Sequence, residues 1–111
     1  SSFRDYFPRH LDDSDVEVKR SAIWGVGYFG IKSELEKLRR LFDDEELRPD
    51  ALFAYSLAVP GETSKSRMKS LLNRIDKEVG GLSSHEEELV KVALDERLTL
   101  AGKEPYFVHE M

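Results

Sequence analysis

The fold is decided by the segment DVEVKRSAIWG, residues 15–25, which returns 29 residues later as DEELRPDALFA, residues 44–54. An acid, an aliphatic residue, a base and a small residue occupy the same places in both copies. They are Asp15, Val18, Lys19 and Ala22 in the first copy, and Asp44, Leu47, Arg48 and Ala51 in the second. Spacings of three and four residues are those of one helix face. A helical pattern repeated at this period is typical of a solenoid.

Composition predicts one domain over residues 1–111, with 40% hydrophobic and 35% charged residues. The absence of cysteine excludes disulfides and thiol chemistry and fits a cytoplasmic protein. The longest apolar run, residues 22–31, is far shorter than the ~20 residues that cross a bilayer, so we expect no membrane partner. Because the sequence begins with Ser, we expect a processed, trimmed or partial chain.

The periodicity predicts an all-α fold of about five helices, without a strand pattern. The expected helices are residues 15–29, 33–42, 48–59, 64–79 and 84–101. We expect Gly30 to end the first of these helices and Pro49 to lie in the first turn of the third. Residues 1–11 should form a short helix or an irregular lead-in over the first repeat's open end.

Two Ser-x-x-Glu sequences predict capping boxes, Ser33 with Glu36 and Ser84 with Glu87. In the last helix the expected inward residues are Leu89, Val92, Ala93, Leu98 and Leu100. The apolar tail at residues 106–108 should fold back over this helix.

The doubled pattern resembles the first helix of a HEAT repeat, and in particular the short bacterial HEAT-like repeats of the phycobilin-lyase type. The resemblance implies a short right-handed α-solenoid, with repeat 1 at about residues 12–42 and repeat 2 at about 43–79. A terminal helix and tail would occupy residues 83–111, where the pattern returns with Val90 in place of the base and Asp95 in place of the bulky residue. Small residues three apart would let neighbouring helices approach. Lys19 and Arg48 could pair with the repeat acids.

Three motifs invite a more specific reading, and the sequence disfavours each. Gly25, Gly27 and Gly30 spell GxGxxG, but the segment before them has helical periodicity, so close packing and a helix cap are preferred to a nucleotide loop. This interpretation gives no full reason for Gly27. Asp13-x-Asp15-x-Glu17 lacks the rest of a calcium loop, which favours helix capping. The scattered histidines indicate no metal site, and no catalytic constellation or cofactor motif is present.

The second helices of the two repeats are basic although the chain carries a net charge of −5. Residues 32–42 and 64–79 hold nine Lys or Arg and four acids. In a HEAT-like solenoid these helices line the concave face, so they could form a basic groove. Its candidate binding residues are Arg39, Arg40, Arg67, Arg74 and Lys77. The alternative is a solvated face with paired charges.

We therefore expect a non-catalytic domain that binds another protein, within a longer repeat array or a homo-oligomer. The alternative is nucleic-acid or other anion binding through the basic groove, by resemblance to DNA glycosylases built of HEAT-like repeats. That alternative requires exposed aromatic side chains, with Trp24, Tyr28 and Tyr55 as candidates. A chromophore-lyase activity rests on the family name alone.

Overall fold

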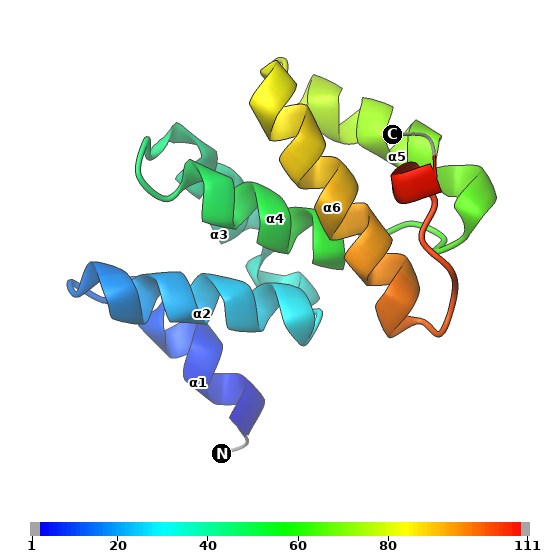
Figure 1. Cartoon of the computed structure of the whole chain (residues 1–111). Helices are drawn as coiled ribbons and strands as arrows, with labels where there is room; N and C mark the ends of the chain where they lie inside the picture. Colours follow the sequence, from blue (N-terminus) through cyan, green and yellow to red (C-terminus); the bar gives the residue numbers. More distant parts are fainter. Residues whose placement is uncertain (1–2, 110–111) are drawn as a thin grey trace. The chain divides into compact units, whose positions relative to one another are not determined.

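The structure is a computed structural model that describes residues 3–109, and between them it contains six α-helices and no strand (Figure 1). Contacts divide the chain into two compact units, of which the first ends at Val59 and the second begins at Pro60. The first unit contains α1 (Phe3–His10), α2 (Val16–Tyr28), α3 (Leu35–Arg40) and α4 (Arg48–Ala58), with 3₁₀ turns η1 (Lys32–Glu34) and η2 (Leu41–Asp43) on either side of α3. The second contains α5 (Lys65–Glu78), α6 (Ser84–Leu100) and the 3₁₀ turn η3 (Phe107–His109).

The all-helical prediction is confirmed, but the expected number of about five helices is wrong, because the N-terminal lead-in forms the additional helix α1. This helix packs on α2, which also packs on α4, while α3 packs on α4. The predicted second repeat, residues 43–79, has its first helix in one unit and its second in the other. Its pairing, and the solenoid that depends on it, therefore stay predictions.

The two repeat aspartates share an extended backbone conformation, φ −80°, ψ 118° at Asp15 and φ −89°, ψ 110° at Asp44. Asp15 is the N-cap of α2, whereas Asp44 precedes the turn at residues 45–47 that leads into α4. Oδ1 of Asp15 accepts from the amides two and three residues ahead, at 2.9 and 3.3 Å, and Oδ1 of Asp44 does so at 3.0 and 3.1 Å. Each main-chain carbonyl also accepts from the amide four residues ahead. The predicted capping role is confirmed for Asp15. Asp44 makes the same hydrogen bonds one turn before α4, whose N-cap, Leu47, has no side-chain cap.

The packing of α2 explains the three glycines of the GxGxxG sequence, which the sequence alone explained only in part. A Cβ on Gly27 would lie 2.7 Å from Cα and 2.8 Å from Cβ of Ala54 in α4, so only a hydrogen allows this approach. A Cβ on Gly25 would lie 2.1 Å from the ring of Phe7 in α1. Gly30 follows α2 with a φ of 60°, a conformation that L side chains rarely adopt. The preferred interpretation of close packing and a C-terminal cap is confirmed.

Asp50 joins α2 to α4 through two side chains one helical turn apart. Its Oδ1 accepts from Trp24 Nε1 at 2.7 Å, and its Oδ2 accepts from Arg20 Nε at 3.1 Å. Hydrogen bonds to Glu17 and then to Asp50 raise the pKa of Arg20. The indole ring also packs on Phe53, with ring centroids 4.6 Å apart. The arginine that forms the ion pair between α2 and α4 is therefore Arg20. The sequence analysis named its neighbour, Lys19, for such a role.

The capping box predicted at Ser33 and Glu36 is wrong. Ser33 lies inside the 3₁₀ turn η1, and its hydroxyl donates to the Glu34 carboxylate at 3.0 Å. The residue that precedes α3 is Glu34, and it makes no side-chain cap. A serine inside a turn does not have the extended backbone that an N-cap requires.

The second predicted box is wrong by one residue. Ser83, with ψ 167°, is the N-cap of α6; its hydroxyl accepts from Glu86 N at 3.1 Å, and Glu86 accepts from Ser83 N at 3.1 Å. The sequence SSHEEE permits both registers, because adjacent serines precede adjacent glutamates.

The inward face of α6 also differs from the prediction. Val92 and Leu100 are 52% and 59% exposed, so their predicted burial is wrong. The buried face is Val90, Ala93, Leu94, Arg97 and Leu98. These spacings of three and four residues form one stripe, and an arginine occupies one place in it.

The tail folds back on α6, as predicted. The Asp95 carboxylate accepts from three consecutive amides, those of residues 106, 107 and 108, at 2.8, 2.9 and 2.9 Å. Phe107 is only 1% exposed as a result of this docking.

We expect Asp15→Ala and Asp44→Ala each to lower the free energy of unfolding by about 1 kcal/mol, because each removes the same pair of hydrogen bonds to backbone amides. Their effects should add in the double variant, since the two aspartates share no partner. Urea unfolding followed by circular dichroism measures both, with Asp43→Ala as the control beside one of them. A cost at only one aspartate would contradict the equivalence of the two copies.

We expect Gly27→Ala to destabilise the chain by about 1–3 kcal/mol, because the added methyl group would overlap the α4 backbone. The gain in helix propensity, about 1 kcal/mol, acts in the opposite direction. Ser21→Ala, at an exposed place in α2, is the control and should be neutral or slightly stabilising. A Gly27→Ala variant more stable than the parent would contradict the close approach.

Candidate functional site

The structure distributes the five predicted basic residues over both units. Arg39 and Arg40 belong to the first unit, and Arg67, Arg74 and Lys77 belong to the second. A groove through all five would run across both units and remains a proposal. Within the units, Arg40 lines one pocket, and Arg67 and Arg74 line another.

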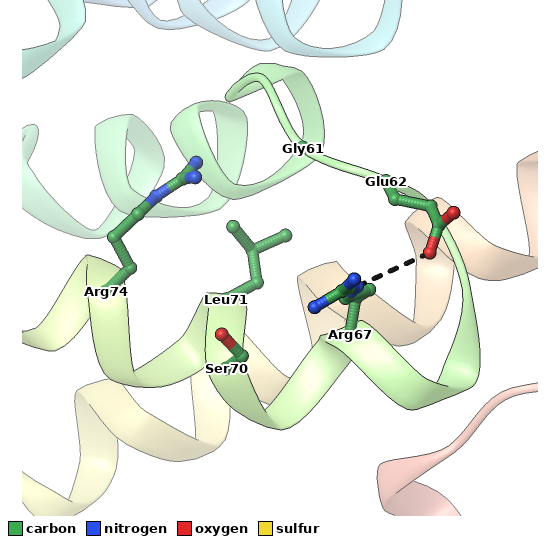
Figure 2. A pocket seen from close by; sticks show the side chains of 6 residues that line it. All are labelled: Gly61, Glu62, Arg67, Ser70, Leu71 and Arg74. Atoms are coloured by element: carbon green, nitrogen blue, oxygen red, sulfur yellow. Dashed lines mark ion pairs between the residues drawn. The ribbon is translucent and has the colours of Figure 1, made fainter.

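The pocket of the second unit has a volume of about 340 Å³ (Figure 2). It is lined by Gly61, Glu62, Arg67, Ser70, Leu71 and Arg74. The two arginines lie seven residues apart on α5, which places them on one face of the helix, two turns apart. Figure 2 shows Leu71 between them and the Gly61 loop opposite. We call this the arginine pocket.

Carboxylates already contact both arginines of the pocket. Arg67 Nε lies 3.5 Å from Glu62 Oε2, and both side chains are about two-thirds exposed, at 65% and 64%. Arg74 Nε lies 3.3 Å from Glu78 Oε1, one turn along α5. Arg39, in the first unit, pairs likewise with Glu36 at 3.4 Å. Three of the five predicted binding residues are therefore paired with neighbouring acids.

Four cationic side chains bind the loop that forms one wall of the arginine pocket, residues 60–63. Arg74 donates to the Pro60 carbonyl and Lys103 to the Thr63 carbonyl. Arg97 donates to the Gly61 carbonyl at 2.7 Å and to the Thr63 hydroxyl at 2.8 Å. Arg67 completes the set through its ion pair with Glu62.

Sequence reasoning missed Arg97. Burial, and then the positive charge of Arg74, lower the pKa of Arg97 from its ordinary value. The second cause indicates positive potential beside the pocket. The available signal was its position on α6, four residues after Ala93 and three after Leu94, which places it on the buried stripe.

The pocket of the first unit is smaller, about 100 Å³, and lies between the loop before α2 and the helices α2 and α3. Its lining is Leu11, Asp12, Lys19, Lys37, Arg40 and Leu41. Lys37 Nζ lies 2.9 Å from Asp12 Oδ2. The hydrogen bond and charge of Lys37 lower the pKa of Asp12, with smaller contributions from Lys19 and Arg40, and Asp12 in turn raises the pKa of Lys37.

Three exposed aromatic side chains lie on α1 and at the end of α2. Tyr6, Tyr28 and Phe29 are 42%, 41% and 40% exposed. Phe29 stacks on Phe7 with ring centroids 5.3 Å apart, and Tyr6 meets the same ring edge-on at 5.6 Å. Tyr28 stacks instead on Trp24, with ring centroids 6.1 Å apart. We call the three exposed residues together the aromatic edge. Tyr28 is thus the candidate aromatic that the structure leaves accessible to a partner.

The other two candidate aromatics are engaged elsewhere. Tyr55 is 3% exposed, and Trp24 donates its indole N–H to Asp50 at 2.7 Å. Neither presents the open ring face on which a nucleic-acid base stacks.

The structure also shows the surroundings of Asp13, which belongs to the sequence that partly resembles a calcium loop. Asp13 accepts from Asp15 N at 2.8 Å and contacts His10, and these two hydrogen bonds lower the pKa of Asp13. Among residues 3–109, no group of three His, Asp or Glu side chains is arranged to hold a metal ion. In the same range no helix has the length and apolar character that crossing a membrane requires.

Comparison with known proteins gives no match: no family model fits the sequence, and neither a curated protein nor a solved structure matches the chain. The HEAT-like interpretation therefore depends on the repeated sequence pattern.

We expect Asp12→Asn to lower stability only within a pH window. The lowered pKa of Asp12 stabilises the fold above its ordinary 3.8, and this contribution is lost as the pH falls through the lowered value. The raised pKa of Lys37 stabilises the fold below its ordinary 10.5, and this contribution is lost as the pH rises through the raised value. Unfolding free energies of parent and variant, measured against pH, should therefore differ between these limits and converge outside them.

Asp43→Asn, at an exposed position of the same unit, is the control and should give a difference without this window. A difference between parent and Asp12→Asn that persists in strong acid would contradict the assignment.

Proposed function

We propose that the chain is a non-catalytic protein-interaction domain of the HEAT-repeat type. The observation that carries the proposal is the equivalent hydrogen bonding of Asp15 and Asp44, each of which accepts from the amides two and three residues ahead. The close approach of α2 and α4 at Gly27 and Ala54 supports it, since stacked first helices are what a helical repeat requires.

In this proposal α2 with α3, and α4 with α5, are the two helix pairs, and α6 follows them. A partner would bind along the exposed helix faces. The aromatic edge supplies the apolar part of such a surface, because large aromatic side chains dominate interface energetics. Its three members are Tyr6, Tyr28 and Phe29.

Anion binding through the second helices is the second candidate, and the pocket between Arg67 and Arg74 favours it. A protein carrying acidic residues suits this surface better than a nucleic acid does. Nucleic-acid binding also requires exposed rings on which bases stack, and of the three candidate aromatics Tyr55 is buried. The proposed partner is therefore another protein.

The test is to recover cross-linked partners from the native cells and measure the affinity of the purified partner by calorimetry. We expect the double variant Tyr28→Glu and Phe29→Glu to weaken binding by about tenfold or more, because it places charge in an apolar contact. Val92→Glu, at a similarly exposed apolar position on α6, is the control for added surface charge.

Recovery of nucleic acid, with salt-dependent binding that Arg40→Glu weakens, would favour the second candidate instead. Unchanged affinity in both the aromatic-edge variant and Arg40→Glu would contradict both proposed surfaces.

A further inference from the structure

We propose that the arginine pocket receives a glutamate or aspartate side chain from an acidic peptide segment, which takes the place of Glu62 beside Arg67. The inference rests on the proposed function, because it names the chemical group by which a protein partner would be held in the second unit. It adds a specific contact that the repeat pattern does not contain.

The geometry suits one side chain with a charged end and an aliphatic stem. Arg67 and Arg74 stand two helical turns apart, about 10 Å along the axis, with the open cavity between them. Leu71 lies between the two guanidinium groups and offers an apolar contact for methylene groups. Ser70 adds a hydroxyl that can donate to a carboxylate oxygen.

Glu62 is a replaceable occupant. Its ion pair with Arg67 is 3.5 Å long and largely exposed on both sides, so it contributes little to stability. Glu62 Oε2 also accepts from the Ser64 hydroxyl at 2.9 Å, an exposed hydrogen bond that water can replace. The backbone next to it is fixed, since Arg97 and Lys103 bind the carbonyls of Gly61 and Thr63. The Glu62 side chain can therefore turn away while the wall of the pocket keeps its place.

The surroundings favour an added negative charge. Arg74 also donates to the Pro60 carbonyl, and Arg97 and Lys103 donate to carbonyl and hydroxyl oxygens of the same loop. Arg74 is also paired with Glu78 at 3.3 Å, so the four cations around the loop face two carboxylates, Glu78 and the replaceable Glu62. Arg74 is close enough to Arg97 to lower its pKa. An incoming carboxylate would thus meet several cations within one small region.

A carboxylate is favoured over a phosphate by what the pocket already contains. Glu62 shows that a carboxylate fits beside Arg67, and Leu71 provides the apolar contact that a carboxylate side chain, unlike a free phosphate, can use. Phosphate is therefore the competing ligand in the test.

The experiment measures fluorescence anisotropy of a fluorescein-labelled peptide, GLEELEG, on titration with the whole chain at low salt. The peptide GLQQLQG is the uncharged control. We expect Arg67→Gln and Arg74→Gln each to raise the Kd about fivefold or more, because each removes one side of the pocket. Lys69→Gln makes the same change of charge on another face of α5 and should alter the Kd less than about twofold.

The Glu62→Gln variant tests whether the resident carboxylate competes with the peptide. Removing the resident carboxylate should lower the Kd more than Glu104→Gln does, although both variants remove one negative charge from the second unit. Arg67→Gln keeps the test independent of folding, because the Arg67 side chain is exposed and circular dichroism can verify the helices.

Equal effects of Arg67→Gln and Lys69→Gln, or of Glu62→Gln and Glu104→Gln, would overturn the inference. Displacement of the peptide by millimolar inorganic phosphate, but not by acetate at the same concentration, would also overturn it, in favour of a phosphate site.

If a native partner depends on the aromatic edge but not on Arg67, the inference fails while the proposed function stands. If the peptide binds as expected and no protein partner exists, the pocket stands and the proposed function fails.

Discussion

The first unit depends on the place where the backbones of α2 and α4 meet, at Gly27 and Ala54. With Cα and Cβ of Ala54 less than 3 Å from where a Cβ of Gly27 would lie, no larger residue fits without separating the helices. This approach brings Trp24 and Arg20 of α2 within hydrogen-bond distance of Asp50. A glycine that costs about 1 kcal/mol in helix propensity thus permits contacts worth more than that cost.

Local chemistry explains which parts of the fold could be predicted from the sequence. Asp15, Asp44, Gly30 and Pro49 act through the backbone within one turn, so their roles follow from sequence position alone. The boundaries of α2 and the start of α4 were predictable for this reason. Gly27 was not explained, because its reason is a residue of another helix, 27 positions away in the sequence.

The errors occurred where the sequence permits two registers. Adjacent serines before adjacent glutamates allow two capping boxes, and only the backbone conformation at Ser83 selects one. The inward face of α6 was misplaced because Arg97 occupies its stripe, while Val92 and Leu100 are apolar but exposed. Hydrophobicity alone could not identify a buried arginine whose partners, Gly61 and Thr63, lie in a loop more than thirty residues earlier.

In the candidate site, too, features within one helix could be predicted, while contacts between segments distant in the sequence could not. Arg67 and Arg74 were identifiable from their charge and from their helix, and the structure places both on one pocket. Their combination with Arg97 and Lys103 around one loop could not be predicted, because those residues belong to α6 and to the segment after it. The sequence therefore indicated where positive charge is carried but not what that charge contacts.

The weaker return of the repeat pattern in α6 departs from the first two copies at Val90 and Asp95. Contacts within the second unit account for both departures. Val90 stands where the other copies have a base, and it is fully buried. Asp95 stands where they have an aromatic ring, and its carboxylate binds the amides that seat Phe107 against α6. An aromatic ring at residue 95 could not accept those three amides. The sequence pattern thus departs at a position where the carboxylate of Asp95 holds the tail on α6.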